Sequence, residues 1–346
     1  MKIPSRSALL CLLLVAGPLT PAASAWDYEG HRIVNQLALA SLPLDFPAFV
    51  RAPEASGRIA FLAGDPDRWK NTPEFALGHV NNPDHYLDIE QLDWAGLDAA
   101  SLSPFRYEFA VRFAAGRAAH PEKFPADAGK NLDHTREWPG FLPWAITESF
   151  ARLQSAFAYL KAFEQGGGTP EEIANARADV IYFMGVMGHY VGDGAQPLHV
   201  TVHHNGWVGD NPRGYTTDRK FHAWIDGGFI ASAGVRLADL APRVPAAAVL
   251  PAAPAPGGMF SEVMRYLQAQ HARVEPLYQI EKEGKLRADG TPGSLDGRGF
   301  IEEQLLRGGS MLGSIWLTAW RTAPEDKYLL GQLALRHKPA TAPAGK

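Results

Sequence analysis

The residues able to do chemistry gather in one part of this chain, where two pairs of side chains are spaced four apart. The pairs are His189 with Asp193 and His222 with Asp226. Residues four apart lie on one face of a helix, so each pair presents two ligands in the same direction. Neutral imidazole and carboxylate are the ligands that zinc accepts where cysteine is absent. The spacing therefore predicts a metal site.

A third imidazole, His199, follows the first pair closely. The segment Gly194-Ala195-Gln196-Pro197 lies between them. Proline removes a backbone donor and disfavours helix before it, so this segment should end the helix that carries His189 and Asp193. We expect the chain to turn there and to bring His199 back towards the same site.

Further ligands lie upstream, at His31, Asp65 and His85. Together with the later cluster they supply enough nitrogen and oxygen donors for more than one zinc ion. Two or three clustered zinc ions are suited to phosphate-ester hydrolysis, because one pair can share a hydroxide while a further ion stabilises the leaving oxygen. Each ion would need a position open to solvent.

Two of these ligands have competitors nearby. Asp67 competes with Asp65, although Asp-Pro-Asp is also a turn sequence. Asp65 is preferred because it leaves Arg68 three residues further on. The interval between Asp65 and His85 is rather long, so His79 is a weaker alternative to His85.

The first 25 residues are typical of a cleaved secretory signal. Lys2 and Arg6 precede an apolar stretch over 8–17, and Ala23-Ser24-Ala25 resembles a cleavage site. The only cysteine, Cys11, lies inside this segment. We therefore expect a secreted or periplasmic protein that starts at Trp26 and holds together without disulfides, by its core, by metal, or by both.

The charge balance excludes one class of nucleic-acid-binding protein. The 33 basic and 37 acidic residues give a formal net charge of −4, and removal of Lys2 and Arg6 makes it more negative. A broad basic face for duplex DNA is therefore not expected. Small or single-stranded substrates held mainly by metal ions remain compatible, since the ions add positive charge.

The apolar periodicity predicts an all-α protein with a single helical domain over 26–336 and a disordered tail over 337–346. Helices are expected over 28–40, 104–118, 144–163, 170–191, 260–283 and 299–322. The fourth should be buried and central, with Thr169 as N-cap and Pro170 in its first turn. The Ala/Pro-rich stretch 241–256 is expected to be a surface loop rather than a domain linker.

The segment 189–199, His-Tyr-Val-Gly-Asp-Gly-Ala-Gln-Pro-Leu-His, resembles the signature of the zinc-dependent phospholipase C and single-strand nuclease superfamily. The resemblance runs from Trp26 to Asp226 and implies an all-α fold around a buried tri-zinc cluster. It also implies that Trp26, once it is the N-terminus, binds zinc through its α-amine and carbonyl oxygen.

By this resemblance three zinc ions are bound. The first would be held by Asp65, His85, His189 and Asp193. Asp193 would bridge to the second, which the Trp26 terminus and His31 complete. The third would be held by His199, His222 and Asp226.

The resemblance also implies roles around the metals. Asp65 would orient or deprotonate the attacking water, and Arg68 would support the phosphate in the transition state. Tyr86 and Asp88 match a nuclease motif in which an aromatic ring stacks on a base and a carboxylate accepts from its edge. The expected substrate is single-stranded DNA or RNA, with removal of 3′-phosphates from nucleotides as a further activity.

The loop 203–215 departs from the nuclease pattern, because only Gly209-Asp210 resembles the family's Gly-Gly-Asn element. Trp207 and Tyr215 could stack on a base or face a lipid headgroup. A phospholipase C acting on phospholipid is therefore an alternative. A second alternative is a non-catalytic exported protein that uses zinc to hold its fold. No stable protein partner is implied.

Overall fold

The computed structural model describes residues 26, 28–125, 129 and 131–336. The expected export signal over 1–25 and the expected disordered tail over 337–346 lie outside the described residues. Every regular element within the described ranges is a helix or a helical turn, and no strand occurs there. This confirms the all-α prediction.

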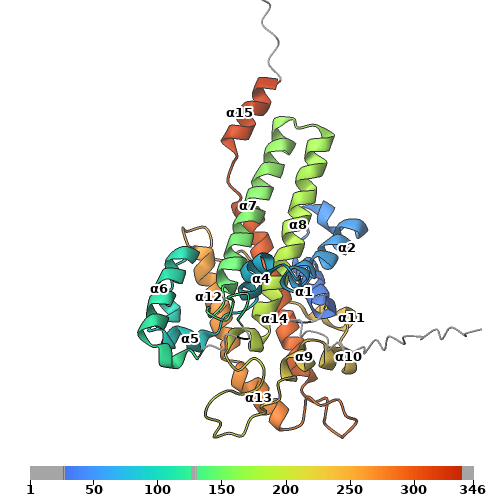
Figure 1. The fold of residues 1–346 in the computed structure, drawn as a ribbon. Coiled ribbons are helices and arrows are strands. Elements are labelled where there is room, and N and C mark those ends of the chain that lie inside the picture. The colour runs from blue at the N-terminus through green and yellow to red at the C-terminus, as the bar shows by residue number, and fades with distance from the viewer. Residues whose placement is uncertain (1–25, 27, 126–128, 130, 337–346) are drawn as a thin grey trace, which may run out of the picture.

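Two long helices form an antiparallel hairpin that projects from the body (Figure 1). They are α7 (Leu142–Gly166) and α8 (Pro170–Ala195). The αL conformation of Gly167 ends α7, and the Thr169 side chain accepts from the Glu172 N–H to begin α8. Thr169 and Glu172 form a capping box, which confirms the predicted N-cap.

Two further helices, α1 (Tyr28–Ser41) and α14 (Arg298–Thr322), pack against the lower half of α8 (Figure 1). Close approach requires a glycine, because a Cβ atom at Gly188 would lie 1.6 Å from the Oδ1 atom of Asn35. The Asn35 amide donates to the carbonyl of Gly185 at 3.0 Å and to that of Ile59 at 2.8 Å. These bonds fix α1 between α8 and α2 (Pro53–Leu62).

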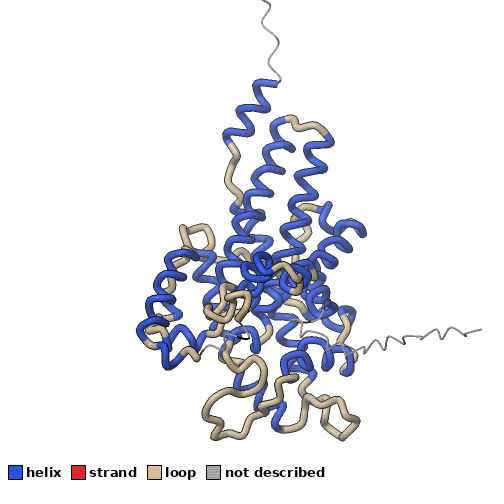
Figure 2. Tube along the Cα trace, viewed as in Figure 1, coloured by secondary structure: helices blue, strands red, loops and turns tan. Residues whose placement is uncertain are grey.

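The remaining elements are short and surround this core. Before the hairpin they are η1 (Ala48–Arg51), α3 (Asp65–Lys70), α4 (Phe75–Asn81), η2 (Asn82–His85), α5 (Ile89–Trp94), η3 (Ala99–Ser101), α6 (Arg106–Ala119) and η4 (Pro121–Lys123). After it come η6 (Pro197–Val200), α9 (Phe221–Ala223), η7 (Trp224–Gly228), α10 (Phe229–Ser232), α11 (Leu237–Leu240), η8 (Ala241–Arg243), α12 (Gly258–His271), α13 (Val274–Lys282) and α15 (Lys327–Arg336). The longest loops lie at the end of the molecule opposite the hairpin tip (Figure 2).

One of the predicted helices is divided into two in the structure. The helix expected over 260–283 is interrupted between His271 and Val274, where α12 ends and α13 begins. Pro276 explains the interruption, since its ring would clash with the carbonyl four residues earlier in a continuous helix. In the observed structure Pro276 occupies the first turn of α13, where proline is tolerated.

The Ala/Pro-rich stretch 241–256 is bonded to the body of the protein. The Ala247 N–H donates to the carbonyl of Ser41 at the end of α1, and the Leu250 N–H donates to the Thr318 hydroxyl of α14, each at 2.9 Å. The buried apolar residues form one connected cluster that includes Trp26, Trp144 and Trp316. None of the described helices is long and apolar enough to cross a membrane.

Candidate metal centre

Helix α8 presents His189 and Asp193 on one buried face, as their spacing predicts. The Nε2 atom of His189 lies 3.3 Å from Asp193 Oδ2. His31, from α1, stacks on the His189 ring with centroids 3.9 Å apart. This approach requires Gly192, because a Cβ atom there would lie 2.7 Å from the His31 ring nitrogen. The close packing of α1 on α8 therefore brings three candidate ligands together.

The carboxylate of Asp193 lies between imidazoles that come from different elements. Its Oδ2 atom is 3.0 Å from the Nδ1 atom of His85, which is the last residue of η2. Its Oδ1 atom is 3.3 Å from the Nε2 atom of His31. One carboxylate thus turns each oxygen to a different set of histidines, which is the arrangement that a bridging ligand needs.

Asp67, not Asp65, joins these residues: it forms one candidate metal group with His31 and His189, beside the group of His85, His189 and Asp193. The Oδ1 atom of Asp67 lies 3.7 Å from His189 Nε2 and 3.9 Å from His85 Nδ1. Asp65 pairs instead with Arg68, and it belongs to none of the candidate metal groups. Two residues along a helix correspond to a rotation of about 200° around its axis, so their side chains lie on nearly opposite faces. Helix α3 can therefore turn only one of the two aspartates to the site. The structure thus brings Asp67, and not the preferred Asp65, to the candidate metal groups.

The same rotation changes which cation lies at the site. The Nζ atom of Lys70 lies 2.8 Å from Asp67 Oδ1, and Lys70 lines the cavity beside the metal groups. Arg68 does not line that cavity, and its guanidinium covers the ring of Phe61 at 4.5 Å. Lys70 follows Asp67 by three residues, just as Arg68 follows Asp65. The sequence therefore contains two aspartate–cation pairs with the same spacing, and the structure places the second pair at the site.

The third group consists of His199, His222 and Asp226, as predicted. The Nε2 atoms of His199 and His222 lie 3.0 Å apart, and His222 Nε2 lies 3.0 Å from Asp226 Oδ2. Asp226 belongs to a short π-helix, η7, a wide helical turn that is frequent at functional sites. The Gln196 amide donates to the other oxygen of Asp226 at 2.7 Å, which orients the carboxylate.

Outer hydrogen bonds orient two of the imidazoles. The Nδ1–H of His189 donates to the carbonyl of Ala63, and the Nδ1–H of His199 donates to the carbonyl of His85, each at 2.7 Å. In the neutral rings the Nε2 atoms then carry no proton, and they face the other ligands. Bonds of this kind are typical around metal-binding histidines, whose tautomer and orientation they fix.

Three buried His/Asp groups are thus able to hold metal ions, and in each the candidate ligand atoms lie within 4.8 Å of one another. Both ring nitrogens of His31, Asp193 Oδ1 and Asp226 Oδ2 are buried and form no hydrogen bond with any described residue. Buried polar atoms without partners are costly, and ligation of a cation would satisfy them. The residues present therefore fit a set of bound metal ions.

Burial keeps key histidines in the form that binds metal. Burial, reinforced by Lys70, lowers the pKa of His85 to about 3. Burial, with His204 and then Lys70 nearby, also lowers the pKa of His222 to about 3. Both rings are therefore neutral at pH 7, as ligation requires. Burial raises the pKa of Asp226 to about 8, so a neighbouring cation would favour its ionised form.

The metal groups border a cavity of about 540 Å³, into which His85, His199 and His222 open. Tyr86 and Asp88 line the same cavity, so the structure brings both proposed substrate-binding residues to the metal centre. Asp88 accepts from the Gln91 amide through Oδ2 at 2.7 Å, while its Oδ1 has no hydrogen-bond partner among the described residues. Burial raises the pKa of Asp88 to about 6.

A tight backbone contact fixes the segment that carries Tyr86 and Asp88. Gly140 has φ +104°, and a Cβ atom there would lie 1.9 Å from the carbonyl oxygen of Tyr86. Only glycine accommodates both the conformation and the contact. The Asp88 N–H donates to the carbonyl of Pro139 at 2.6 Å, which ties the same two segments together.

Other candidates lie beside the cluster or away from it. Trp26 is fully buried, and its indole N–H donates to the carbonyl of Gly192 at 2.8 Å, so it lies next to His31. His79 bonds through its ring to the carbonyl of Asp133 at 2.7 Å and joins no metal group. The structure therefore favours His85 over His79.

In the loop 203–215 the two large rings serve local packing. Trp207 stacks on His203 with centroids 3.8 Å apart, and Tyr215 packs on Tyr278 at 5.5 Å. Neither Trp207 nor Tyr215 lines the cavity. The region contributes His204 and Asn205 to the cavity instead.

No protein-family model and no curated protein sequence matches this chain.

Proposed function

We propose that this protein is an exported zinc-dependent phosphodiesterase that hydrolyses single-stranded nucleic acid. The observation that carries the proposal is that His85, His199 and His222 line the same large cavity as Tyr86 and Asp88. Ligands of a purely structural zinc ion usually enclose it, whereas a catalytic ion keeps a position open to substrate. The open wall of histidines favours the catalytic type.

Three ions would be bound by the residues that lie together. Asp67, His85, His189 and Asp193 would hold the first. Asp193 would share the second with His31 and the amino terminus of mature Trp26. His199, His222 and Asp226 would hold the third. Zinc bound there would supply a Lewis acid and a source of hydroxide at neutral pH.

The charged pair at the end of α3 would serve the reaction at phosphorus. Asp67 lies at the metal groups and would orient a water molecule. Lys70, 2.8 Å from Asp67, would place its positive charge against the non-bridging phosphate oxygens, where charge grows in the transition state. Asp67 and Lys70 would thus take the positions that the family resemblance implied for Asp65 and Arg68.

Tyr86 and Asp88, which line the same cavity, would select the substrate. The Tyr86 ring offers a face for stacking. The Oδ1 atom of Asp88 forms no hydrogen bond with a described residue and lies 3.8 Å from the His204 ring, so it offers an acceptor for an amino group on a base edge. A base must leave its duplex to stack and bond in this way, so single strands are the better substrates. A terminal 3′-phosphate would occupy the same position as an internal phosphodiester.

The test is hydrolysis by zinc-loaded protein that starts at Trp26. Single-stranded DNA and RNA are offered beside phosphatidylcholine vesicles, with and without chelator. We expect release of nucleotides that stops on chelation and returns with zinc. Nucleic acids that stay intact at full zinc occupancy would overturn the nuclease proposal.

A phospholipase C is the second candidate, and one observation favours it. Helix α4 exposes Phe75 and Leu77, and it is followed directly by η2, whose Asn82 and His85 line the cavity. An exposed apolar rim beside the site is what contact with a lipid surface requires. Diacylglycerol release without nucleotide release would identify this activity. Zinc binding without hydrolysis of any phosphodiester would support the non-catalytic alternative.

A further inference from the structure

A second cavity lies behind the wall that carries the metal ligands. Its volume is about 320 Å³, within the range of small-molecule pockets. Consecutive residues face the two cavities: Trp69, Asn81 and Asp84 line this one, while Lys70, Asn82 and His85 line the metal-side cavity. A single layer of chain therefore separates two distinct chambers.

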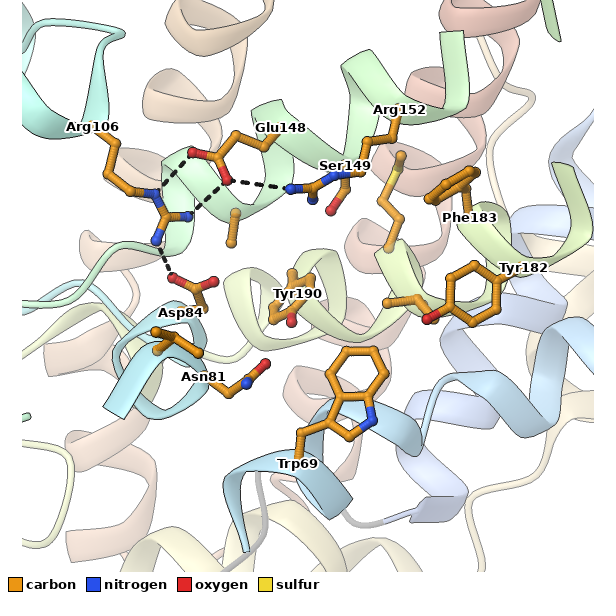
Figure 3. A pocket seen from close by; sticks show the side chains of 14 residues that line it. Trp69, Asn81, Asp84, Arg106, Glu148, Ser149, Arg152, Tyr182, Phe183 and Tyr190 are labelled. Atoms are coloured by element: carbon orange, nitrogen blue, oxygen red, sulfur yellow. Dashed lines mark hydrogen bonds and ion pairs between the residues drawn. The ribbon is translucent and has the colours of Figure 1, made fainter. Parts of the chain in front are cut away.

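A closed ion-pair network occupies one end of this second cavity (Figure 3). The Arg106 guanidinium donates to Asp84 at 2.6 Å and to both oxygens of Glu148 at 2.8 and 3.1 Å. All three guanidinium nitrogens of Arg106 thus donate to Asp84 or Glu148. Arg152 is different, because its closest approach to Glu148 is 3.9 Å and its side chain is 59% exposed. Arg152 therefore keeps donors for an incoming anion.

Two hydroxyl groups face the space without partners. Tyr190 and Ser149 both line the cavity and are 5% and 6% exposed. Neither hydroxyl forms a hydrogen bond with any residue that the structure describes, whereas a buried tyrosine hydroxyl usually has a partner. In Figure 3 the Tyr190 ring lies in the middle of the cavity, between the ion pairs and the aromatic end. These two groups are ready to bond a ligand.

Aromatic side chains form the opposite end of the cavity (Figure 3). Trp69 comes from α3, and Tyr182 and Phe183 come from α8. Such rings favour the flat face of another ring. The hydroxyls in the middle, and Arg152 with its 3.9 Å ion pair to Glu148, add specific polar contacts.

We propose that this cavity is a second binding site, for a molecule that joins a planar heteroaromatic ring to one anionic group. The ring would lie against Trp69 and Tyr182, its polar atoms would bond the Tyr190 and Ser149 hydroxyls, and the anion would pair with Arg152. A nucleoside monophosphate and an aromatic carboxylate both have this chemistry. Binding here requires neither metal nor hydrolysis, so it does not depend on the proposed activity.

The test is calorimetric titration of zinc-loaded protein with adenosine monophosphate and, separately, with indole-3-acetate. Arg152→Ala and Tyr190→Phe should each weaken binding at this site about tenfold or more, because each removes a hydrogen bond to a charged or polar ligand atom. Tyr86→Ala, in the other cavity, should leave that binding event unchanged. Preference for one probe identifies the phosphate or the carboxylate as the anion.

Matched controls come from the same two helices. Arg177→Ala removes an exposed arginine that pairs with Glu164 on the hairpin, and Tyr159→Ala removes an exposed tyrosine of α7. Neither should change binding. Zinc content is measured for Tyr190→Phe, since His189 is its neighbour. Absence of binding by both probes, or binding that only Tyr86→Ala weakens, would overturn the proposal, whatever the outcome of the hydrolysis assay.

Discussion

Lys70 and Asp67 form a nearly buried ion pair at the end of α3, with Nζ 2.8 Å from Oδ1 and each side chain 12% exposed. Asp67 is at the same time within 4 Å of His85 and His189. The pair therefore joins the metal group to the cavity. The neighbouring pair, Asp65 with Arg68, is rotated away from both.

Asp67→Asn should abolish most activity, and Asp65→Asn should not. Loss of outer partners of metal ligands alone costs ~10–100-fold, so we expect kcat/KM to fall by more than about 100-fold in Asp67→Asn. Asp65→Asn should stay within a few-fold of the wild type. The measurement is chelator-sensitive hydrolysis with zinc content determined in parallel. The reverse order would restore Asp65 as the ligand.

Lys70→Ala should lower kcat more than it raises KM. Removal of one group that stabilises transition-state charge typically costs about 10²–10³ in kcat. Arg68→Ala is the matched control, since it removes a cation two residues away that covers Phe61. Steady-state kinetics on a short single strand give the comparison. Equal losses in the two variants would argue against a specific role for Lys70.

Asp193→Asn should lose two metal ions together, because its two oxygens face different histidines. Asp226→Asn should lose one, because the carboxylate of Asp226 lies with His222 in the third group alone. Zinc is counted by elemental analysis after dialysis against low free zinc. Full occupancy in Asp193→Asn would show that this carboxylate does not bridge.

Tyr86→Ala should weaken substrate binding more than chemistry. Stacking of one base contributes ~1–3 kcal/mol, so KM should rise about 5- to 150-fold with a smaller change in kcat. Tyr86→Phe keeps the ring and should stay near the wild type. Tyr107→Ala, a change of an exposed tyrosine on α6, is the control for general effects. An unchanged KM in Tyr86→Ala would mean that the ring serves packing.

The metal-free protein should lose stability as the pH rises from about 6.5 to 8. The pKa of Asp226 is about 8 when folded, against 3.8 for a free carboxyl, so between these values the folded protein binds a proton that the unfolded chain does not. Raising the pH through this range removes that stabilisation. Despite burial, Asp193 and Asp67 hold the pKa of His189 above its usual 6.5, which acts in the same direction.

Below pH 6.5 the contribution of His85 and His222 changes stability in the opposite direction: it increases stability as the pH rises. Their folded pKa values are about 3, so the unfolded chain binds more protons between pH 3 and 6.5, and stability contributed by these rings grows as the pH rises. Thermal unfolding of the chelator-treated, metal-free protein across pH 5 to 8.5 measures both the rise in stability below pH 6.5 and the fall above it. Asp226→Asn should flatten the alkaline fall; an undiminished fall would assign it to other groups.

The local sequence determined the elements that carry ligands in pairs. His189 with Asp193, and His222 with Asp226, are set by helical periodicity, which acts over four residues and needs no tertiary information. Pro197 ended α8 for a similarly local reason, and Thr169 began it. The all-α class and the two His/Asp pairs were accessible in this way.

Tertiary structure decided what depends on helix rotation and on long-range packing. Asp65 and Asp67 are both plausible ligands in sequence, and only the docking of α3 against α8 turns Asp67 inward. The sequence allows Trp207 to stack on a nucleic-acid base, but in the structure Trp207 stacks on His203 and does not line the cavity. The second cavity is formed by Trp69, Arg106 and Tyr190 from three separate helices, and no local pattern records such a meeting. Contacts between residues distant in sequence arise from shape and packing, which periodicity does not encode.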